Sequence, residues 1–374
     1  MVSFTCFEGD YPDVKQTTSQ EQSKSHEAPL RGFETLVYLV CTTKQNGAYD
    51  GFSCTSDDGQ SLLDTLILSQ WEECAWMGRL SYDVTSCETK QIVGGKKLTA
   101  QLNEEWNSNF LKEFEKKAFQ SSGGIIKPSY IKNNQEEILF CVASGESERS
   151  VIVPLVATPQ EGTLIIVNAN PIEYGHIFLL PYCHHKRTQS FGGALQLITQ
   201  IADEVDSLSF RMFYDYSATN TDRTYFQASY FANPLPVELL PIIPIYGSSI
   251  DGIQILEVAD YPLNALVFAS KNLRKLADVV GEICSTLQHR NTVFNLLISD
   301  CGTKMFLFPQ VHLPVTGHHL HAWECGGYFI YRKSLDFDNA SEKEISKWLA
   351  SVSIDAEGFQ SLKQLCCGIT AKFS

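Results

Sequence analysis

The stretch TLIIVNANPIEYGHIFLLPYC, residues 163–183, has the pattern of two β-strands joined by a turn. Its apolar runs are rich in the β-branched and aromatic residues typical of strands, and Pro171 to Gly175 supply the turn between them. The preceding stretches, EEILFCVAS and SVIVPLV, have the same character. This part of the chain is therefore expected to form neighbouring strands of a sheet.

Helical patterns flank these strands. Residues 61–79 (SLLDTLILSQWEECAWMGR), with Ser61 as N-cap, and residues 192–207 (GALQLITQIADEVDSL) place apolar residues at helical spacing. The stretches LSYDVTSCETKQIVGG and LTAQLN predict a hairpin that turns at Gly94-Gly95, and SFRMFYDYSA with TYFQASYFA predicts a further strand pair. A polar loop is expected over 121–135.

A second group of elements follows with a similar order. It comprises the strands GIQILEV and NALVFAS, the helix LRKLADVVGEICSTLQHR, the strands VFNLLISDC, KMFLFPQ and GGYFIYRK, and a closing helix SEKEISKWLASV. Two similar strand–helix–strand groups predict an internal duplication. Helices that segregate from antiparallel strands predict an α+β fold.

Composition shifts divide the chain into four predicted segments. Residues 10–32 are polar and poor in aliphatic side chains, so 1–32 is expected to be disordered. The first half is predicted over 33–232 and the second over 250–374. The segment 233–249 between them contains NPLPVELLPIIP, whose four prolines exclude a regular helix or a central strand, and it is expected to be a proline-rich arm.

Charge excludes one class of partner. The 374 residues carry 29 Lys plus Arg against 43 Asp plus Glu, a net charge of −14, and 44% of them are hydrophobic. An acidic chain repels the phosphate backbone, so nucleic-acid binding is not expected. The hydrophobic content supports a globular core.

The sequence also predicts a compartment. It shows no secretory leader and no apolar run long enough to span a membrane, so neither secretion nor membrane insertion is expected. Its 12 cysteines are scattered without a CxxC pair, which is typical of reduced thiols. We therefore expect a cytoplasmic or nuclear protein.

Several blocks of the chain together carry a family resemblance. They are LSYDVTSCETK, TAQLNE, PIEYGHIFLLP, FQASYFANPLPVE, FNLLISDCG and FLFPQ, which span about 61–368. In these blocks the chain resembles the plant GDP-L-galactose phosphorylases and, more distantly, the animal GDP-D-glucose phosphorylases, of the histidine-triad and galactose-1-phosphate uridylyltransferase superfamily. The resemblance implies two histidine-triad-like halves with antiparallel sheets and packed helices.

The same resemblance implies a mechanism and a departure from it. In the family, a His-Leu-His-Phe-Gln strand supplies a neutral imidazole that attacks the α-phosphorus of a GDP-hexose, and phosphate then resolves the guanylyl-histidine. Here the matching residues are Arg223-Thr224-Tyr225-Phe226-Gln227, so Tyr225 stands at the nucleophile position and Arg223 at the first histidine. A phenol with a pKa near 10 is a poor substitute. Gln227 is the residue of the motif that remains.

Three other segments depart from the family pattern. The basic segment expected after Leu-Asn-Glu reads Glu105-Trp106-Asn107-Ser108-Asn109-Phe110 here, without a cation. The glycine-containing loop before the motif is Asp215-Tyr216 followed by 217–220, and a glycine–histidine pair of the second half is Gly327-Tyr328. These changes predict loss of phosphorolysis. They also predict a pocket lined by Gln227, Asp215, Tyr216, Trp106, Phe110 and Tyr328.

Each candidate catalytic residue has two interpretations. His176 either lines the pocket as an acid or base, or is a turn histidine satisfied by backbone. Tyr225 is either a proton donor or acceptor, with a pKa that Arg223 can lower, or an aromatic filler of the vacated nucleotide space. Arg223 either binds a carbonyl or anionic group, or pairs with Asp215 or Asp222, and pairing is favoured.

The sequence offers little support for a metal. His318, His319 and His321 have the spacing of metal ligands, with Cys325 nearby, but no second ligand cluster accompanies them, so neither a metal nor another cofactor is expected. The expected partner is a small molecule.

Three functions follow from these observations. The first is an enzyme whose inherited pocket performs acid/base chemistry, of the isomerase or cyclase type, on a less charged plant specialised metabolite. The second is a catalytically inactive regulator that binds a metabolite or a protein. The third is a residual GDP-hexose phosphorylase that converts GDP-L-galactose and phosphate to L-galactose 1-phosphate and GDP in ascorbate biosynthesis. Retention of PIEYGH and FQASY tilts the choice towards the first.

Overall fold

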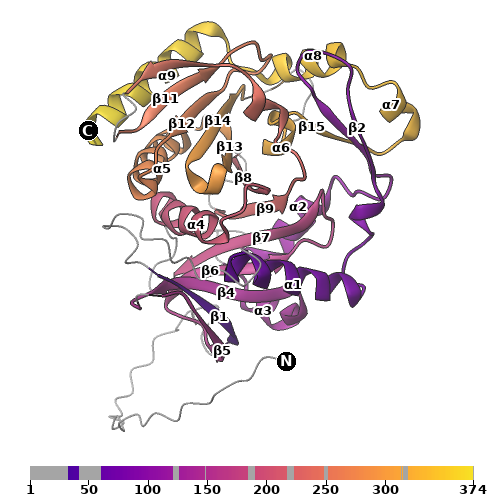
Figure 1. Cartoon of the computed structure of the whole chain (residues 1–374), viewed down its shortest axis with the longest axis vertical. Coiled ribbons are helices and arrows are strands. Elements are labelled where there is room, and N and C mark those ends of the chain that lie inside the picture. The colour runs from indigo at the N-terminus through magenta and orange to yellow at the C-terminus, as the bar shows by residue number, and fades with distance from the viewer. Residues whose placement is uncertain are drawn as a thin grey trace.

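One large sheet runs through the molecule. The computed structural model describes residues 33–41, 60–120, 126–147, 149–183, 190–216, 223–247, 252–312, 314 and 319–373. Within them, twelve strands pair in the order β10-β11-β12-β14-β13-β8-β9-β7-β6-β4-β1-β5 (Figure 1). They are β1 (Glu34–Cys41), β4 (Ile138–Gly145), β5 (Val151–Ala157), β6 (Glu161–Val167), β7 (Tyr174–Cys183), β8 (Phe210–Tyr216), β9 (Phe226–Tyr230), β10 (Ile242–Tyr246), β11 (Gln254–Val258), β12 (Leu266–Ala269), β13 (Val293–Ser299) and β14 (Lys304–Gln310).

A small sheet and a set of helices complete the described part. The predicted hairpin is confirmed as β2 (Glu88–Gln91) and β3 (Thr99–Leu102), and β3 also pairs with β15 (Tyr328–Tyr331). The helices are α1 (Leu62–Trp76), α2 (Phe110–Ala118), α3 (Pro128–Asn133), α4 (Phe191–Val205), α5 (Leu273–His289), α6 (Ala322–Cys325), α7 (Ser334–Asp338), α8 (Glu342–Val352) and α9 (Ala356–Thr370). Among these residues no helix is long and apolar enough to cross a membrane.

The order of strands reveals the duplication. In the first half, β6-β7-β9-β8 are neighbours and α4 connects β7 to β8; in the second, β11-β12-β14-β13 have the same order and α5 connects β12 to β13. The two halves meet where β8 pairs with β13 in antiparallel register, with Leu296 opposite Tyr214. All neighbouring pairs of this sheet are antiparallel except β1 with β4. The predicted α+β fold class is confirmed.

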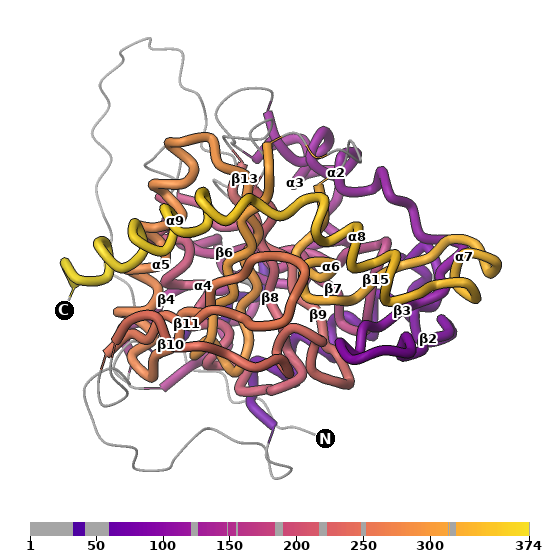
Figure 2. Tube along the Cα trace, turned by 90° about the horizontal axis from the view of Figure 1, so that it is seen from above, coloured from indigo at the N-terminus to yellow at the C-terminus, as the bar shows by residue number. Residues whose placement is uncertain are grey.

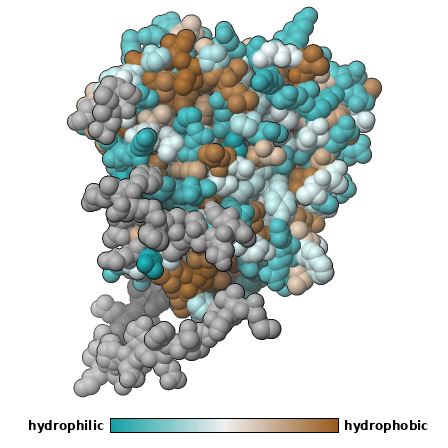
Figure 3. All heavy atoms as spheres, viewed as in Figure 1, coloured by the Kyte–Doolittle hydropathy of each residue, from teal (hydrophilic) through white to brown (hydrophobic). Residues whose placement is uncertain are grey.

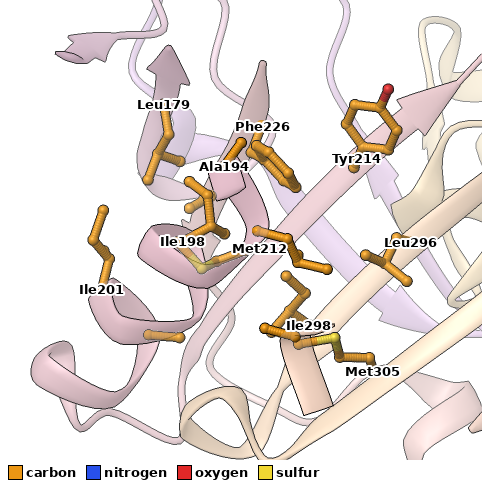
Figure 4. Packing of buried hydrophobic residues seen from close by; sticks show 14 of the residues in the cluster. Leu179, Ala194, Ile198, Ile201, Met212, Tyr214, Phe226, Leu296, Ile298 and Met305 are labelled. Carbon is orange, nitrogen blue, oxygen red and sulfur yellow. The ribbon is translucent and has the colours of Figure 1, made fainter. Parts of the chain in front are cut away.

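Each face of the sheet has its own hydrophobic cluster because side chains alternate along a strand. Helices α1, α4, α5 and α9 cover one face; there Met212 and Tyr214 of the first half pack with Leu296 and Ile298 of the second (Figure 4). The other face is covered by α2 and α3 in the first half, and by α6, α8 and the small sheet in the second. One continuous core therefore joins both halves beneath the helices.

The predicted N-cap of α1 is confirmed: the side chain of Ser61 accepts a hydrogen bond from the backbone N–H of Asp64. The proline-rich segment contains a short 3₁₀ turn (Pro236–Leu239) and then β10, an edge strand that includes Pro244. An edge position suits proline, which lacks a backbone donor. The predicted domain boundaries stay a prediction, and residues 1–32 lie outside the described part.

Three helices differ from the sequence expectations. The expected closing helix is α8, but α9 follows it, with Asp355 as N-cap and Phe359, Leu362, Cys366 and Ile369 along a buried face.

Helix α3 lies inside the expected polar loop 121–135. Helix α2 was not expected either, although Phe110, Phe114 and Ala118 recur at every fourth residue. Helices α2 and α3 have nine and six residues, a length at which packing rather than intrinsic propensity stabilises a helix. Figure 2 shows α8 and α9 running across the second half.

The connecting helices α4 and α5 approach each other at two glycines. A methyl group on Gly281 would lie 2.8 Å from the Cα atom of Gly192, closer than real contacts allow. We therefore expect Gly281→Ala to destabilise the protein, because a backbone shift is needed to relieve the overlap, at a cost of about 1–3 kcal/mol that exceeds the gain of roughly 1 kcal/mol in helix propensity. A lower midpoint in urea unfolding would show this.

Gly368→Ala is the matched control. Gly368 also lies inside a helix, α9, but a methyl group there meets no atom within 4 Å. The control should unfold at an equal or higher urea concentration than wild type. If both variants behave alike, the close approach of α4 and α5 has no energetic role.

Candidate functional site

A single carboxylate, that of Glu115, binds both Tyr225 and Arg223. The Tyr225 hydroxyl donates to Oε1 of Glu115 at 2.9 Å, and Nη1 of Arg223 lies 3.0 Å from Oε2 of the same carboxylate. Arg223 and Tyr225 immediately precede β9, two residues apart, so both reach one side of the sheet. Arg223 pairs with Glu115 rather than with the expected Asp215, and Asp222 lies outside the described residues.

The surroundings of Tyr225 keep its phenol protonated. Burial raises the pKa of Tyr225 well above its ordinary value, and the charge and hydrogen bond of Glu115 raise it further, with a contribution from Asp215. The expectation that Arg223 lowers this pKa is therefore wrong, because burial and the negative charge of Glu115 both disfavour the phenolate. In this state Tyr225 is a hydrogen-bond donor, not a base.

Aromatic rings form the wall behind Tyr225. Phe114 of α2 stacks on Phe178 of β7 with ring centroids 4.0 Å apart and planes 6° from parallel. Both rings meet Tyr225 edge-on at 5.7 and 6.0 Å, and Phe119 lies 5.8 Å away. Phe110, a predicted pocket residue, stacks at 6.5 Å on the same Phe178. These contacts place Tyr225 beside an apolar surface.

His176 is fully enclosed. The backbone N–H of Ile172 donates to its Nδ1 at 3.0 Å, and Nδ2 of Asn168 lies 3.1 Å from the same nitrogen. Burial lowers the pKa of His176 to about 3, so the ring is neutral at pH 7, and Gln227 interacts with it. The backbone contact to Ile172 favours the interpretation of a satisfied turn histidine.

Asp215 belongs to a second polar group, on the strand next to β9. Its Oδ2 accepts from Nδ1 of His321 at 2.8 Å. Its Oδ1 accepts from Nδ2 of Asn295 at 2.6 Å and from the backbone N–H of Ala322 at 2.9 Å. Asp215 and Asn295 are directly opposite each other in the β8–β13 pairing, so this group lies where the two halves join.

Electrostatic interactions connect the two groups. The charge of Asp215 contributes to the pKa of Tyr225, and the charge of Glu115 contributes to the pKa of His321. The β8–β9 pairing sets Phe213 opposite Gln227, and the same register continued by two residues sets Asp215 opposite Tyr225. One site therefore contains Arg223, Tyr225, Glu115, Asp215 and His321. Sequence reasoning did not identify Glu115, because it lies in the unexpected helix α2, and it considered His321 only as a metal ligand.

The other predicted pocket residues lie elsewhere. Tyr216 follows Asp215 and thus points to the opposite face, where it stacks on Phe294 under α5. Tyr328 donates to Glu173 and packs on Phe231 beside the small sheet. Trp106 is partly buried and packs against two hydrophobic clusters: the one beneath α1, α4, α5 and α9, and the one beneath α6 and α8. None of the three has a described contact with Tyr225.

The described residues contain no group of three or more His, Cys, Asp or Glu side chains arranged to hold a metal ion. His319 contacts the backbone oxygen of Val311, and His318 lies outside the described part.

Two surface hollows lie away from Tyr225. One, of about 520 Å³, lies between the end of α5, the end of β14 and the start of α9; the other, of about 200 Å³, lies between the β2–β3 hairpin and residues 233–239. Neither is lined by Arg223, Tyr225 or His321. Figure 3 shows hydrophilic residues interspersed with hydrophobic ones on the face that it displays.

Comparison with known proteins identifies the family. The family model described as GDPGP1-like, N-terminal domain, matches residues 62–229, and the one described as GDPGP1-like, C-terminal domain, matches residues 236–373. GDP-L-galactose phosphorylase 1 of Arabidopsis thaliana is 33% identical over 330 residues, which cover 82% of this chain and 73% of the relative. GDP-D-glucose phosphorylase 1 of Danio rerio is 20% identical over 82% of this chain and 91% of the relative.

A solved structure supports the fold. The crystal structure of yeast Ap4A phosphorylase Apa2 in complex with AMP superposes with a TM-score of 0.51, covering 78% of this chain and 96% of that chain at 12% identity. This likeness concerns the fold alone. The two family models and the Arabidopsis relative show that the chain belongs to the GDPGP1-like family of GDP-hexose phosphorylases.

Proposed function

We propose that this chain has lost GDP-hexose phosphorolysis and that its pocket performs acid/base chemistry, of the isomerase or cyclase type, on a less charged plant specialised metabolite. The observation that carries the proposal is the Glu115 carboxylate, which binds both Tyr225 and Arg223 at the positions where the resemblance implies histidines. A protonated phenol paired with a carboxylate is not a nucleophile for phosphorus.

The charge of the site argues against a nucleotide sugar. A diphosphate needs cations or backbone donors, but Arg223 is already neutralised by Glu115, and Asp215 adds a second negative charge. The segment 104–110 contains two glutamates and no cation. A ligand without formal charge avoids this repulsion and gains from the aromatic wall of Phe110, Phe114 and Phe178.

The residues have distinct roles in this proposal. Tyr225, kept protonated, donates a hydrogen bond or a proton to a carbonyl oxygen of the substrate. Arg223 stabilises negative charge that develops on that oxygen, and Glu115 positions both groups. His176 is neutral and buried, and with Gln227 it supports the floor of the site rather than contacting the reacting atoms.

A catalytically inactive regulator is the second candidate. Phe114 stacks on Phe178 and packs against Tyr225. In the family that the chain resembles, this face of the sheet faces the substrate, so rings that fill the space favour a regulator without catalytic activity. A binding protein needs no competent acid or base. A residual phosphorylase is the third candidate and has the least support.

The first test addresses phosphorolysis. Purified protein incubated with phosphate and GDP-L-galactose or GDP-D-glucose should release no GDP, because the site lacks an available imidazole at position 225 and cations at 104–110. The Arabidopsis relative is the positive control. Turnover, or a guanylylated protein in intact-mass spectra, would refute the loss of activity.

Restoring the histidine should not restore the reaction. In Tyr225→His the new imidazole lies beside Glu115, which favours the protonated, non-nucleophilic form, and the α- and β-phosphates still lack cationic partners. GDP release by this single variant, measured in the same assay, would show that a nucleotide site has survived.

Thermal-shift screening tests the repurposed pocket. A ligand at about 100 times its Kd stabilises the fold by nearly 3 kcal/mol. Neutral plant metabolites should therefore raise the melting temperature, GDP and GDP-mannose should not, and Tyr225→Ala should lose the response.

Tyr225→Phe separates the acid role from simple filling. It retains the ring contacts with Phe114 and Phe178 but removes the hydroxyl that donates to Glu115. Binding should persist while any conversion that wild type performs is lost. Stabilisation by nucleotides but by no neutral metabolite would contradict the proposal.

A further inference from the structure

His321 has the geometry of an oriented imidazole. Its Nδ1 lies 2.8 Å from Oδ2 of Asp215, and a carboxylate can only accept in such a bond, so Nδ1 carries the proton. The neutral ring then presents its lone pair at Nε2. No described residue hydrogen-bonds to Nε2, and 30% of the His321 side chain is exposed.

The partner of His321 is itself fixed. Oδ1 of Asp215 accepts from Asn295 and from the backbone N–H of Ala322, while its Oδ2 is left for the imidazole. Asn295 belongs to β13 of the other half and Ala322 begins α6, so two separate elements determine where the carboxylate lies. An orienting carboxylate of this kind selects one tautomer and one ring position.

The ring of His321 also rests on an aromatic support. It stacks on Trp323 with centroids 4.4 Å apart and planes 15° from parallel. Trp323 is 1% exposed, yet its Nε1 has no hydrogen-bond partner among the described residues. A buried donor without a partner costs free energy, so it marks a place where a ligand or water oxygen can be bound beside the imidazole.

The charges that face His321 come from three elements. Burial acts to lower the pKa of His321, but the hydrogen bond and charge of Asp215 on β8, with Glu324 on α6 and Glu115 on α2, raise it above its ordinary value. Cys325 is close to Asp215 and keeps its proton, since burial raises the pKa of that thiol. A raised pKa makes the neutral imidazole a stronger base.

We propose that His321, positioned by Asp215, is the general base of this site, and that Tyr225 is its counterpart as proton donor. The proposal rests on the proposed acid/base function and specifies the residue that removes the proton. The sequence suggested His176 as a possible acid or base, but His176 cannot serve, because its Nδ1 accepts from Ile172 and its ring is buried.

The reaction step balances within the site. Nε2 of His321 takes a proton from the carbon that lies between a carbonyl group and a C=C bond of the substrate. The C–H electron pair forms a dienol, and the carbonyl oxygen accepts a hydrogen bond or a proton from Tyr225. The imidazolium then returns its proton to the far carbon of the dienol, and any proton that Tyr225 gave returns to it from the oxygen as the carbonyl group re-forms, which gives the conjugated isomer without an external oxidant or reductant.

Kemp elimination tests the base without knowledge of the natural substrate. In 5-nitrobenzisoxazole, removal of the C–H proton by a base breaks the N–O bond and releases a coloured cyanophenolate. Wild type should accelerate this reaction with a rate that rises with pH through the raised pKa of His321. His321→Gln should lower the enzyme-dependent rate at least about 10-fold, since a positioned base contributes about 10²–10⁴.

Two further variants complete the design. His289→Gln, at the exposed end of α5, is the matched control and should leave the rate unchanged. Asp215→Asn should lower the rate and shift the inflection of the pH–rate profile to lower pH, because the carboxylate that raises the pKa is gone. A merely structural Asp215 would not move that inflection.

Histidine NMR covers the case in which His321→Gln does not fold. In ¹⁵N-histidine-labelled wild type, one ring should be protonated at Nδ1 and titrate above its ordinary pKa, and this signal should change in Asp215→Asn. An unchanged Kemp rate in folded His321→Gln, or the absence of such a ring in the spectra, overturns the proposed base. The proposed function is tested separately, by GDP-hexose turnover and by the thermal-shift response to neutral metabolites, and neither result changes those outcomes, so failure of this inference is distinguishable from failure of the proposed function.

Discussion

The antiparallel pairing of β8 with β13 is the contact on which the rest of the structure depends. It makes one sheet from two similar halves and places α4 and α5 together on the same face. On the opposite face it brings Asp215 next to Asn295. The site is thus built at the junction of the halves, where a residue from each is held by backbone hydrogen bonds rather than by a flexible loop.

The two faces of the sheet differ in how many amino-acid substitutions they tolerate. Side chains such as Met212 and Leu296 fill a continuous core under four helices, so a substitution there disturbs the packing of both halves. Residues of the site face alternate with them along the same strands and lie outside this core, beneath α2, α3, α6, α8 and the small sheet. A chain can therefore keep the fold of the GDPGP1-like family while the chemistry on the site face differs.

Much of the fold was predictable because its strands and long helices have strong local patterns. The β6–β7 hairpin, the Ser61 cap and the helices of the two groups follow from alternation, turn residues and capping. Helix α2 was not predicted, since it has only nine residues, five of them charged, and it is stabilised by Phe114, which stacks on Phe178 from a distant strand. Because α2 was not predicted, Glu115 was not identified as a site residue.

The site was predictable only where strand alternation applies. The two-residue spacing of Arg223 and Tyr225 placed them correctly on one side, and the same rule should have separated Asp215 from Tyr216, its neighbour on β8. The contact of His321 with Asp215 joins residues 106 positions apart, which no local pattern encodes.

Two carboxylates, one guanidinium, one phenol and one imidazole converge on the site face, and their pairing determines what the site can accept. Glu115 neutralises Arg223 and holds the proton of Tyr225, whereas Asp215 raises the pKa of His321. A polyanionic ligand would have to compete with Glu115 for the cation and approach Asp215 as well. A neutral ligand needs to displace neither carboxylate. In the function that we propose, the same pairing that disfavours a diphosphate leaves a protonated phenol as acid and the imidazole of His321 as base.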